Sequence, residues 1–368
     1  MKSGKVNYCT GDEGRKFESE FASLVGSKHA VALTNGTLAL EAALRALGIG
    51  AGDEVIVTPR TFVASVSCIA AVGAVPRFAD VDSDSQNVTA ESISAVLTSK
   101  TRAVICVHLA GWPCEMDAIM ALAEEHGLAV VEDCAQAHGA QYNGVAVGAI
   151  GQLGAWSFCQ DKILTTGGEG GMVTTNDREL WSRMWSYKDH GKSWEAVYER
   201  EHPPGFRWQH ESLGTNWRML EMQAAIGRIQ LQYLDEWHNR RTENAIRLLN
   251  GFSQIDGLRA PRPPEHIEHA WYKFHAFIEP ELLKANWSRE RIMMEVESAA
   301  VPCFAGSCSE VYLEKAFDNS GWRPPERLPV ARKLGETSLM FLIDPTIGPS
   351  SIDKTIEVMN DVMARATR

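Results

Sequence analysis

Short apolar runs alternate with segments of helical periodicity along the first half of the chain. Strands that alternate with helices are joined by right-handed crossovers, and they form a mostly parallel sheet that is covered by helices on both faces. The alternation therefore predicts an α/β fold. The runs that predict strands are 30–33, 54–57, 75–78, 103–108, 128–133 and 171–175.

The last third of the chain does not keep this alternation. A long helical pattern over 220–249 is followed by a proline-rich boundary at 261–264. We predict a large domain over residues 1–250, with the first residues free to pack against the smaller C-terminal α+β domain over 251–368. The elements expected in the smaller domain are a strand over 270–277 and helices over 289–299 and 352–364.

Composition narrows the possible partners and location. The net charge of −11 argues against nucleic-acid binding. The eight cysteines form no C-x-x-C pair, so we expect free thiols in the cytoplasm and no metal site. The opening Met1-Lys2-Ser3 leads into polar sequence, which predicts no export signal. The most apolar window, 63–75, is too short to span a membrane, so we expect no membrane partner.

A single lysine, Lys162, lies between an apolar segment over 154–158 and a glycine-rich run over 167–171. Glycine allows backbone to approach a ligand closely. A lysine held by rigid, partly apolar surroundings is a candidate for Schiff-base formation, because desolvation favours the free amine. A solvated turn would explain the same pattern, so the assignment depends on residues elsewhere in the chain.

Polar residues follow several of the predicted strands. Residues 34–37 (Thr-Asn-Gly-Thr) open a helix, and the backbone N–H groups at a helix N-terminus bind anions. Thr61-Phe62, His108 and Asp133 also fall at or just past strand ends. Ligands of parallel sheets bind beyond the carboxyl ends of the strands. The sequence therefore predicts one site that gathers these residues.

The set matches what pyridoxal phosphate requires. That cofactor needs a lysine for its aldehyde, an acid beside its ring nitrogen, donors for its phosphate and a flat side chain against its ring. Lys162 and Asp133 supply the first two, and the turn over 34–37 with Ser157 supplies donors. A plain strand residue or a capped helix would explain each of them singly, but the combination favours the cofactor.

The sequence resembles the DegT/DnrJ/EryC1/StrS family of pyridoxal-phosphate-dependent nucleotide-sugar aminotransferases over nearly its whole length. No single motif is specific, but the combination is. The residues that carry the resemblance are 34–40 (TNGTLAL), 61–64 (TFVA), 132–140 (EDCAQAHGA), Ser157-Phe158 with Lys162 five residues after the serine, 168–171 (GEGG), 214–219 (GTNWRM) and 223–225 (QAA).

The resemblance implies the α/β fold of type I, like aspartate aminotransferase, and a role for each matching residue. Lys162 would bind the cofactor as a Schiff base and move the proton, and Asp133 would pair with the ring nitrogen. A homodimer with shared active sites would follow, because Asn216 would reach the phosphate in the neighbouring subunit. The other implied contacts are Gln136 near the ring and its 3-oxygen, Phe62 stacked on the ring, Gly36, Thr37 and Ser157 on the phosphate, and His108 and His190 near the sugar, with a structural role as the alternative for each histidine.

The implied reaction moves an amino group from L-glutamate to a nucleotide-linked keto-deoxysugar, with a 4-keto sugar favoured over a 3-keto sugar. The cofactor would cycle through pyridoxamine phosphate, and the product would serve amino-sugar biosynthesis, such as that of a lipopolysaccharide O-antigen. Two alternatives remain. One is a sugar dehydratase that works from pyridoxamine phosphate, although related dehydratases replace the lysine by histidine. The other is a regulatory protein that binds the cofactor without turnover.

Two segments depart from the family pattern. Residues 338–345 lack the usual histidine–proline pair, and residues 301–308 lack the usual tyrosines. Both lie in the predicted small domain, which would help to enclose the substrate. We therefore expect them to bear on the identity of the sugar rather than on the chemistry.

Overall fold

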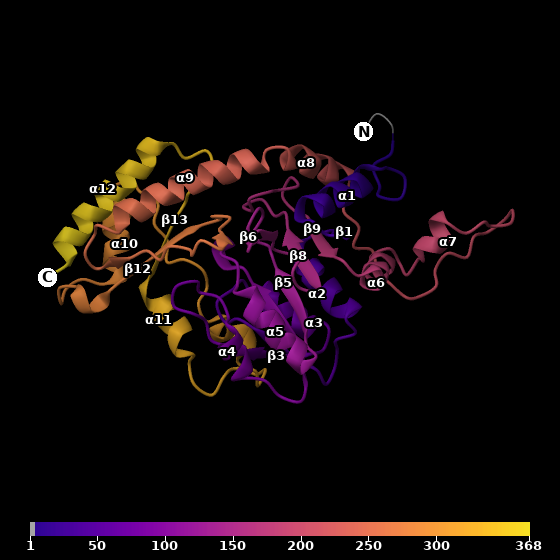
Figure 1. The fold of residues 1–368 in the computed structure, drawn as a ribbon, viewed down its shortest axis with the longest axis horizontal. Coiled ribbons are helices and arrows are strands. Elements are labelled where there is room, and N and C mark those ends of the chain that lie inside the picture. Colours follow the sequence, from indigo (N-terminus) through magenta and orange to yellow (C-terminus); the bar gives the residue numbers. More distant parts are fainter. Residues whose placement is uncertain (1–3) are drawn as a thin grey trace.

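A seven-stranded sheet forms the centre of the computed structural model, which describes residues 4–368 (Figure 1). The prediction that the chain has no export signal rests partly on residues 1–3, which lie outside the described range. Strand β9 runs antiparallel to both of its neighbours and the other strands are parallel to one another, which confirms the mostly parallel sheet. The order is β1-β9-β8-β5-β4-β2-β3, with β1 at His29–Leu33, β2 at Glu54–Val57, β3 at Val75–Phe78, β4 at Thr101–Val107, β5 at Ala129–Asp133, β8 at Leu153–Ser157 and β9 at Gly171–Thr175.

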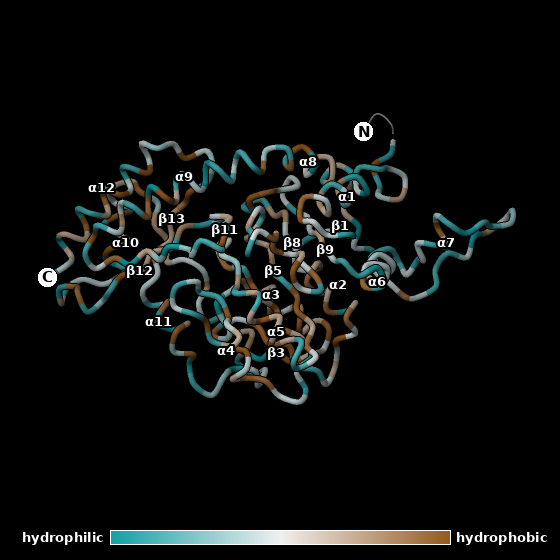
Figure 2. Tube along the Cα trace, in the orientation of Figure 1, coloured by the Kyte–Doolittle hydropathy of each residue, from teal (hydrophilic) through white to brown (hydrophobic). Residues whose placement is uncertain are grey.

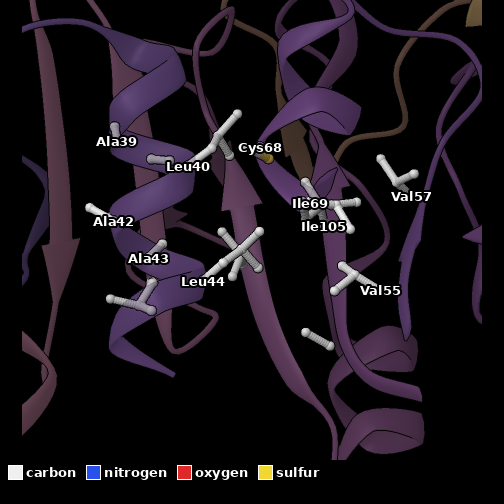
Figure 3. Close-up of a cluster of buried hydrophobic side chains, with 14 of the residues drawn as sticks. Ala39, Leu40, Ala42, Ala43, Leu44, Val55, Val57, Cys68, Ile69 and Ile105 are labelled. Carbon is white, nitrogen blue, oxygen red and sulfur yellow. The ribbon is translucent and has the colours of Figure 1, made fainter. Parts of the chain in front are cut away.

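Helices cover both faces of this sheet because successive strand residues point to opposite sides. On β1, Val31 and Leu33 belong to one core cluster and Ala30 and Ala32 to another. Figure 3 shows the first cluster, where Leu40 and Leu44 of α2 lie beside strand residues. The helices on that face are α2 (Gly36–Ala46), α3 (Ala64–Ala71) and α6 (Arg178–Lys188); those on the other are α1 (Glu13–Val25), α4 (Ala90–Ser94), α5 (Met116–His126) and α8 (Glu221–Leu231).

The helical pattern over 220–249 is two helices and not one. Helix α8 ends at Leu231, and α9 (Leu234–Phe252) continues towards the C-terminal part of the chain, as Figure 1 shows. The second half of α9 packs into the C-terminal core through Leu248 and Phe252. That core therefore includes residues that precede the predicted boundary at 250.

The C-terminal part contains a small antiparallel sheet packed on helices, and of its three strands the sequence predicted the one over 270–277. Figure 2 shows the apolar strands in brown between helices of mixed polarity. One short segment of this part, Val311 to Phe317, returns to pack against Phe78 of the central sheet. The elements are β10 (Leu258–Arg259), β12 (Phe274–Ile278), β13 (Ser338–Phe341), α10 (Arg289–Ser298), α11 (Pro329–Thr337) and α12 (Pro349–Ala366); a further small sheet joins β6 (Gln141–Tyr142), β7 (Val145–Ala146) and β11 (Ile267–Glu268).

Residues 194–212 leave the body of the molecule as an arm (Figure 1). The arm begins with the short helix α7 (Trp194–Tyr198) and returns through a bridge between Lys192 and His210. Phe206 and Trp208 are exposed near its end. Across residues 4–368, no helix combines the length and the apolar character needed to cross a bilayer.

Candidate active site

A pocket of about 760 Å³ lies at the carboxyl ends of the sheet strands. The loops after β1, β2, β5 and β8 form its floor, and segments from the C-terminal part form the opposite wall. Most of the side chains predicted for the cofactor come together there. The predicted residues that line the pocket are Gly36, Thr37, Phe62, Asp133, Gln136, Ser157 and Lys162.

One end of the pocket is a cradle at the N-terminus of α2. Asn35 caps the helix, with its side-chain oxygen accepting the Leu38 N–H at 3.0 Å. The first N–H groups of a helix have no partner within it, so they are available to an anion. Gly36 packs so closely on Ser157 that a Cβ atom at position 36 would lie 2.6 Å from the Ser157 Cβ. Only glycine allows this approach, which places a hydroxyl beside the helix terminus.

Asp133 provides a buried carboxylate at the floor of the pocket. The Ser65 hydroxyl donates to its Oδ2 at 2.7 Å, and the Ala135 N–H donates to its Oδ1 at 3.1 Å. Burial nevertheless raises the pKa of the Asp133 carboxyl. A carboxylate at this depth is stabilised by a cation placed against it. The protonated ring nitrogen of pyridoxal phosphate is such a cation, so the residue fits the predicted role.

Lys162 lies in the loop after β8, with its ammonium group 5.0 Å from the centre of the Tyr272 ring. The Tyr272 hydroxyl donates to Asp161 Oδ2 at 2.6 Å. Burial acts to raise the pKa of Asp161, but the Tyr272 hydrogen bond and the Lys162 charge outweigh it and lower that pKa. Asp161 and Tyr272, which are far apart in the sequence, therefore both contribute to the environment of Lys162.

Gln136 is fixed by a turn that connects it to Tyr272. Its Oε1 accepts the Ala110 N–H at 2.7 Å, and the Ala110 carbonyl accepts the Tyr272 N–H at 2.9 Å. Ala110 and Trp271 both adopt left-handed backbone conformations, with φ of 56° and 52°. Strained residues of this kind persist only where the surrounding structure holds them, and they cluster at functional sites. The turn orients two side chains that line the pocket.

The C-terminal part closes the pocket with residues from the two segments that depart from the family pattern. Ser307 and Cys308 come from the first segment, and Met340 and Leu342 from the second. The position of these residues in the pocket wall agrees with the prediction that the two segments bear on the identity of the sugar. Phe62, from the loop after β2, is 68% exposed and leaves its ring free for a ligand.

His108 does not reach the pocket. It is fully buried, its Nε2 lies 3.0 Å from Glu132 Oε2, and its Nδ1 accepts the Cys114 N–H at 3.0 Å. His108 continues the alternation of Cys106 and so lies on the sheet face of Glu132, whereas Asp133 faces the other side. With both ring nitrogens engaged, it is a structural histidine, and its predicted sugar contact is not carried further.

His108, Glu132 and Cys134 bring ligand atoms within 4.8 Å of one another, as in a metal site. The ligand atoms of His108 and Glu132 are already engaged in hydrogen bonds. The Glu132 carboxylate accepts the N–H groups of Gly148, Ile150 and Gly151 at 2.7–2.9 Å besides its contact with His108. The cluster therefore ties the turn after β7 to the sheet.

His190 and Asn216 lie outside the pocket of their own chain. Both are exposed, and they belong to neighbouring backbone, since Asp189 bridges Asn216 and the His190 N–H donates to the Thr215 carbonyl at 2.9 Å. His190 adopts a left-handed conformation, with φ of 61°. The predicted roles of these two residues, in the sugar contact and in a neighbouring subunit, stay predictions.

Comparison with known proteins places this geometry in a family. The profile of the DegT/DnrJ/EryC1/StrS aminotransferase family matches residues 1–360. The chain belongs to that family. Members of the DegT/DnrJ/EryC1/StrS family are aminotransferases, and this protein is therefore an aminotransferase.

Individual members of the family match over nearly the whole chain. The spore coat polysaccharide biosynthesis protein SpsC of Bacillus subtilis is 37% identical over 97% of this chain and 91% of its own. The dTDP-3-amino-3,4,6-trideoxy-alpha-D-glucose transaminase of Streptomyces venezuelae is 34% identical over 98% and 89%. The crystal structure of an aminotransferase from Psychrobacter cryohalolentis is 59% identical and covers 99% of this chain and 94% of that one, with a TM-score of 0.97. These likenesses confirm the predicted fold class.

Sequence reasoning did not find Asp161, Tyr272 or Lys273, all of which line the pocket. Asp161 precedes the candidate lysine, so its position was a usable signal. Tyr272 and Lys273 lie more than a hundred residues further along the chain, and no spacing pattern connects them to Lys162. Only the packing of the two parts of the chain brings them there.

Proposed function

We propose that this protein uses pyridoxal phosphate to move the amino group of L-glutamate onto the carbonyl carbon of a nucleotide-linked keto-deoxysugar. One observation carries the proposal: Lys162 and the buried Asp133 face a single pocket whose far end is the anion cradle of Gly36 and Ser157. An amine, a buried acid and an anion site around one cavity are what that cofactor requires.

Each residue has a defined part in this reaction. When bound, pyridoxal phosphate supplies an electron sink that stabilises the negative charge left on a carbon after a proton departs. Asp133, held by Ser65, would keep a positive charge on the ring nitrogen. The Nζ of Lys162 would take the proton from the donor carbon and later deliver one to the sugar carbon, as a general acid and base. Phe62 would cover one face of the ring.

The reaction would proceed in two halves through the same pocket. L-glutamate would leave its amino group on the enzyme and depart as 2-oxoglutarate, with the cofactor held as pyridoxamine phosphate until the sugar arrives. A 4-keto-6-deoxy sugar is the first candidate acceptor, as the family resemblance implies. A 3-keto sugar is the second, because the Streptomyces venezuelae relative is named for a 3-amino sugar. The product would serve amino-sugar biosynthesis, such as that of a lipopolysaccharide O-antigen.

A homodimer with shared active sites is part of the proposal. Asn216 is exposed and does not line the pocket of its own chain, so it is free to reach a neighbouring one. Helix α8 presents exposed apolar side chains nearby, among them Met222 at 48% and Ile229 at 58% exposure. Contiguous exposed apolar residues are typical of an interface. A cytoplasmic location is favoured by the eight cysteines, all of them unpaired.

The decisive experiment measures 2-oxoglutarate released from L-glutamate in the presence of UDP-, GDP- and dTDP-linked 4-keto and 3-keto sugars. Release that depends on one sugar, with an aminated sugar as the second product, supports the proposal. A dehydratase would consume the sugar without incorporating nitrogen, and a regulatory protein would bind the cofactor without turnover. Lys162→Ala is the matched control, and an active Lys162→Ala protein would refute the role of the lysine.

A further inference from the structure

Lys273 brings a second ammonium group to the pocket wall, opposite the sheet. It is partly buried, and its ammonium group forms no ion pair or hydrogen bond with the described residues 4–368. The ammonium group lies over the face of the Tyr272 ring, 4.8 Å from the ring centre, and the charges of Asp161 and Asp344 act on it without forming an ion pair. A lysine that is partly withdrawn from water is normally paired with an anion. Here no carboxylate among residues 4–368 lies within ion-pair distance of the ammonium group.

The acidic side chains near Lys273 already accept hydrogen bonds. Asp161 accepts the Tyr272 hydroxyl, Asp344 accepts the Thr346 N–H, and Asp133 is held by Ser65. Arg60 is fully buried, does not line the pocket, and donates to Gln86 and to the Ser307 carbonyl. Among the described residues 4–368, two positively charged side chains line the pocket, Lys162 and Lys273. Lys162 is the proposed attachment point of the cofactor.

The position of Lys273 relative to the reacting centre is set by Tyr272. The two ammonium groups lie 5.0 Å and 4.8 Å from the centre of the same ring. The two ammonium groups therefore contact the same side chain, and a ligand bound at Lys162 lies in the same pocket as Lys273. Burial lowers the pKa of Lys273, and the charges of Asp161 and Asp344 oppose this effect only in part.

We propose that Lys273 binds the carboxylate of the amino donor. The inference rests on the proposed function, because it assumes that one pocket serves both half-reactions. An amino acid has a carboxylate on or near the carbon that loses nitrogen, whereas a keto sugar has hydroxyl groups there and places its diphosphate further away. An ammonium group beside the reacting centre therefore selects the anionic donor, through a charge-assisted hydrogen bond.

The test compares the cofactor-loaded wild-type protein with Lys273→Met and Lys273→Arg variants. The absorbance change of the first half-reaction is followed as a function of L-glutamate concentration, and glutarate binding is measured by calorimetry without turnover. We expect Lys273→Met to weaken both L-glutamate and glutarate binding by about 10- to 100-fold, the range for hydrogen bonds to charged groups. Lys273→Arg should recover most of the affinity, and Lys100→Met, at an exposed lysine, serves as the matched control.

Two results would overturn the inference. One is a Lys273→Met protein with unchanged affinity for L-glutamate and glutarate. The other is a loss confined to the half-reaction with the nucleotide sugar, which would assign Lys273 to the diphosphate. If Lys273→Met does not fold, Lys273→Gln, which removes the charge but keeps a polar side chain, replaces it in both measurements. Failure of the proposed function is a separate outcome, in which the wild type itself releases no 2-oxoglutarate with any sugar.

Discussion

Tyr272 donates a hydrogen bond of 2.6 Å to Asp161, across 111 positions of sequence. The bond joins the segment before β12 to the loop that carries Lys162. Because the Tyr272 ring also lies under the Lys162 ammonium group, one side chain fixes both the lysine and its neighbouring carboxylate. The loop that carries Lys162 is therefore held by a residue from the C-terminal part of the chain as well as by its own turn.

Removing the Tyr272 hydroxyl should impair catalysis while leaving the ring in place. We expect Tyr272→Phe to lower kcat/KM by about 10-fold, because hydrogen bonds to charged groups contribute about 1.5 kcal/mol or more. Loss of this donor should also raise the pKa of Asp161 from its lowered value and move the acidic limb of the pH–rate profile upwards. Tyr142→Phe is the control, since Tyr142 contacts Glu115 at 3.2 Å outside the pocket. Equal pH profiles for the two variants would contradict a positioning role.

Neutralising Asp133 should separate catalysis from stability. Asp133→Asn should reduce kcat by about 10² to 10³, the scale for one preorganised electrostatic group. The absorbance maximum of the bound cofactor should move as well, since its ring nitrogen loses the opposing charge. A variant with unaltered turnover would remove Asp133 from the mechanism.

Although Asp133→Asn should lower the activity of the enzyme, it should raise the stability of the cofactor-free protein. Burial raises the pKa of Asp133, so the folded state binds its proton more tightly than the unfolded state, and stability falls as pH rises through this range. Asp133→Asn removes that penalty. We therefore expect the cofactor-free variant to melt at a higher temperature than the cofactor-free wild type at pH 7, with the gain shrinking below the unfolded pKa of Asp. Thermal melts as a function of pH test this, and a pH-independent difference would contradict it.

A methyl group at position 36 should damage the anion cradle. The added Cβ would lie 2.6 Å from the Ser157 Cβ, so Gly36→Ala must displace the hydroxyl or the helix terminus. We expect a stability loss of about 1 to 3 kcal/mol from overpacking and weaker retention of the cofactor during dialysis. Gly50→Ala is the control, because its nearest neighbour would be an ordinary contact at 3.6 Å. Full cofactor retention by Gly36→Ala would show that the phosphate lies elsewhere.

A buried ion pair joins α1 to α6. The Lys188 ammonium group is fully buried, lies 2.8 Å from Glu18 Oε1 and sits over the Tyr8 ring. Lys188→Met should cost about 3 to 5 kcal/mol, because it leaves a carboxylate with little exposure unpaired. The double variant Glu18→Gln/Lys188→Met should recover part of this loss in urea unfolding. Additive losses would mean that the two side chains act independently.

The proposed dimer can be tested on α8. Ile229→Glu places a charge on a 58% exposed apolar position, so we expect a shift towards monomer in sedimentation velocity together with reduced activity. Ile246→Glu, at a 43% exposed position on α9, is the matched control. An Ile229→Glu protein of unchanged mass and activity would exclude this face of α8 from the interface.

The sequence by itself determined the strands of the central sheet, most helices and the grouping of Gly36, Asp133, Ser157 and Lys162. Each of these follows from short-range rules: apolar periodicity sets an element, and the end of a parallel strand sets the edge at which its next residues lie. The same rules also grouped His108 with the site, but it does not line the pocket. A strand end fixes the edge of the sheet, while the side-chain alternation set by strand register decides which face is reached.

Tertiary structure alone decided which side chains surround Lys162. Tyr272 and Lys273 reach it because α9 carries the chain into a second core and the left-handed turn at Trp271 brings the chain back over the pocket. The break between α8 and α9 was likewise hidden within a continuous helical pattern. Such contacts depend on how two packed bodies meet, and local sequence spacing does not encode that arrangement, because the residues involved are neighbours only after both cores have formed.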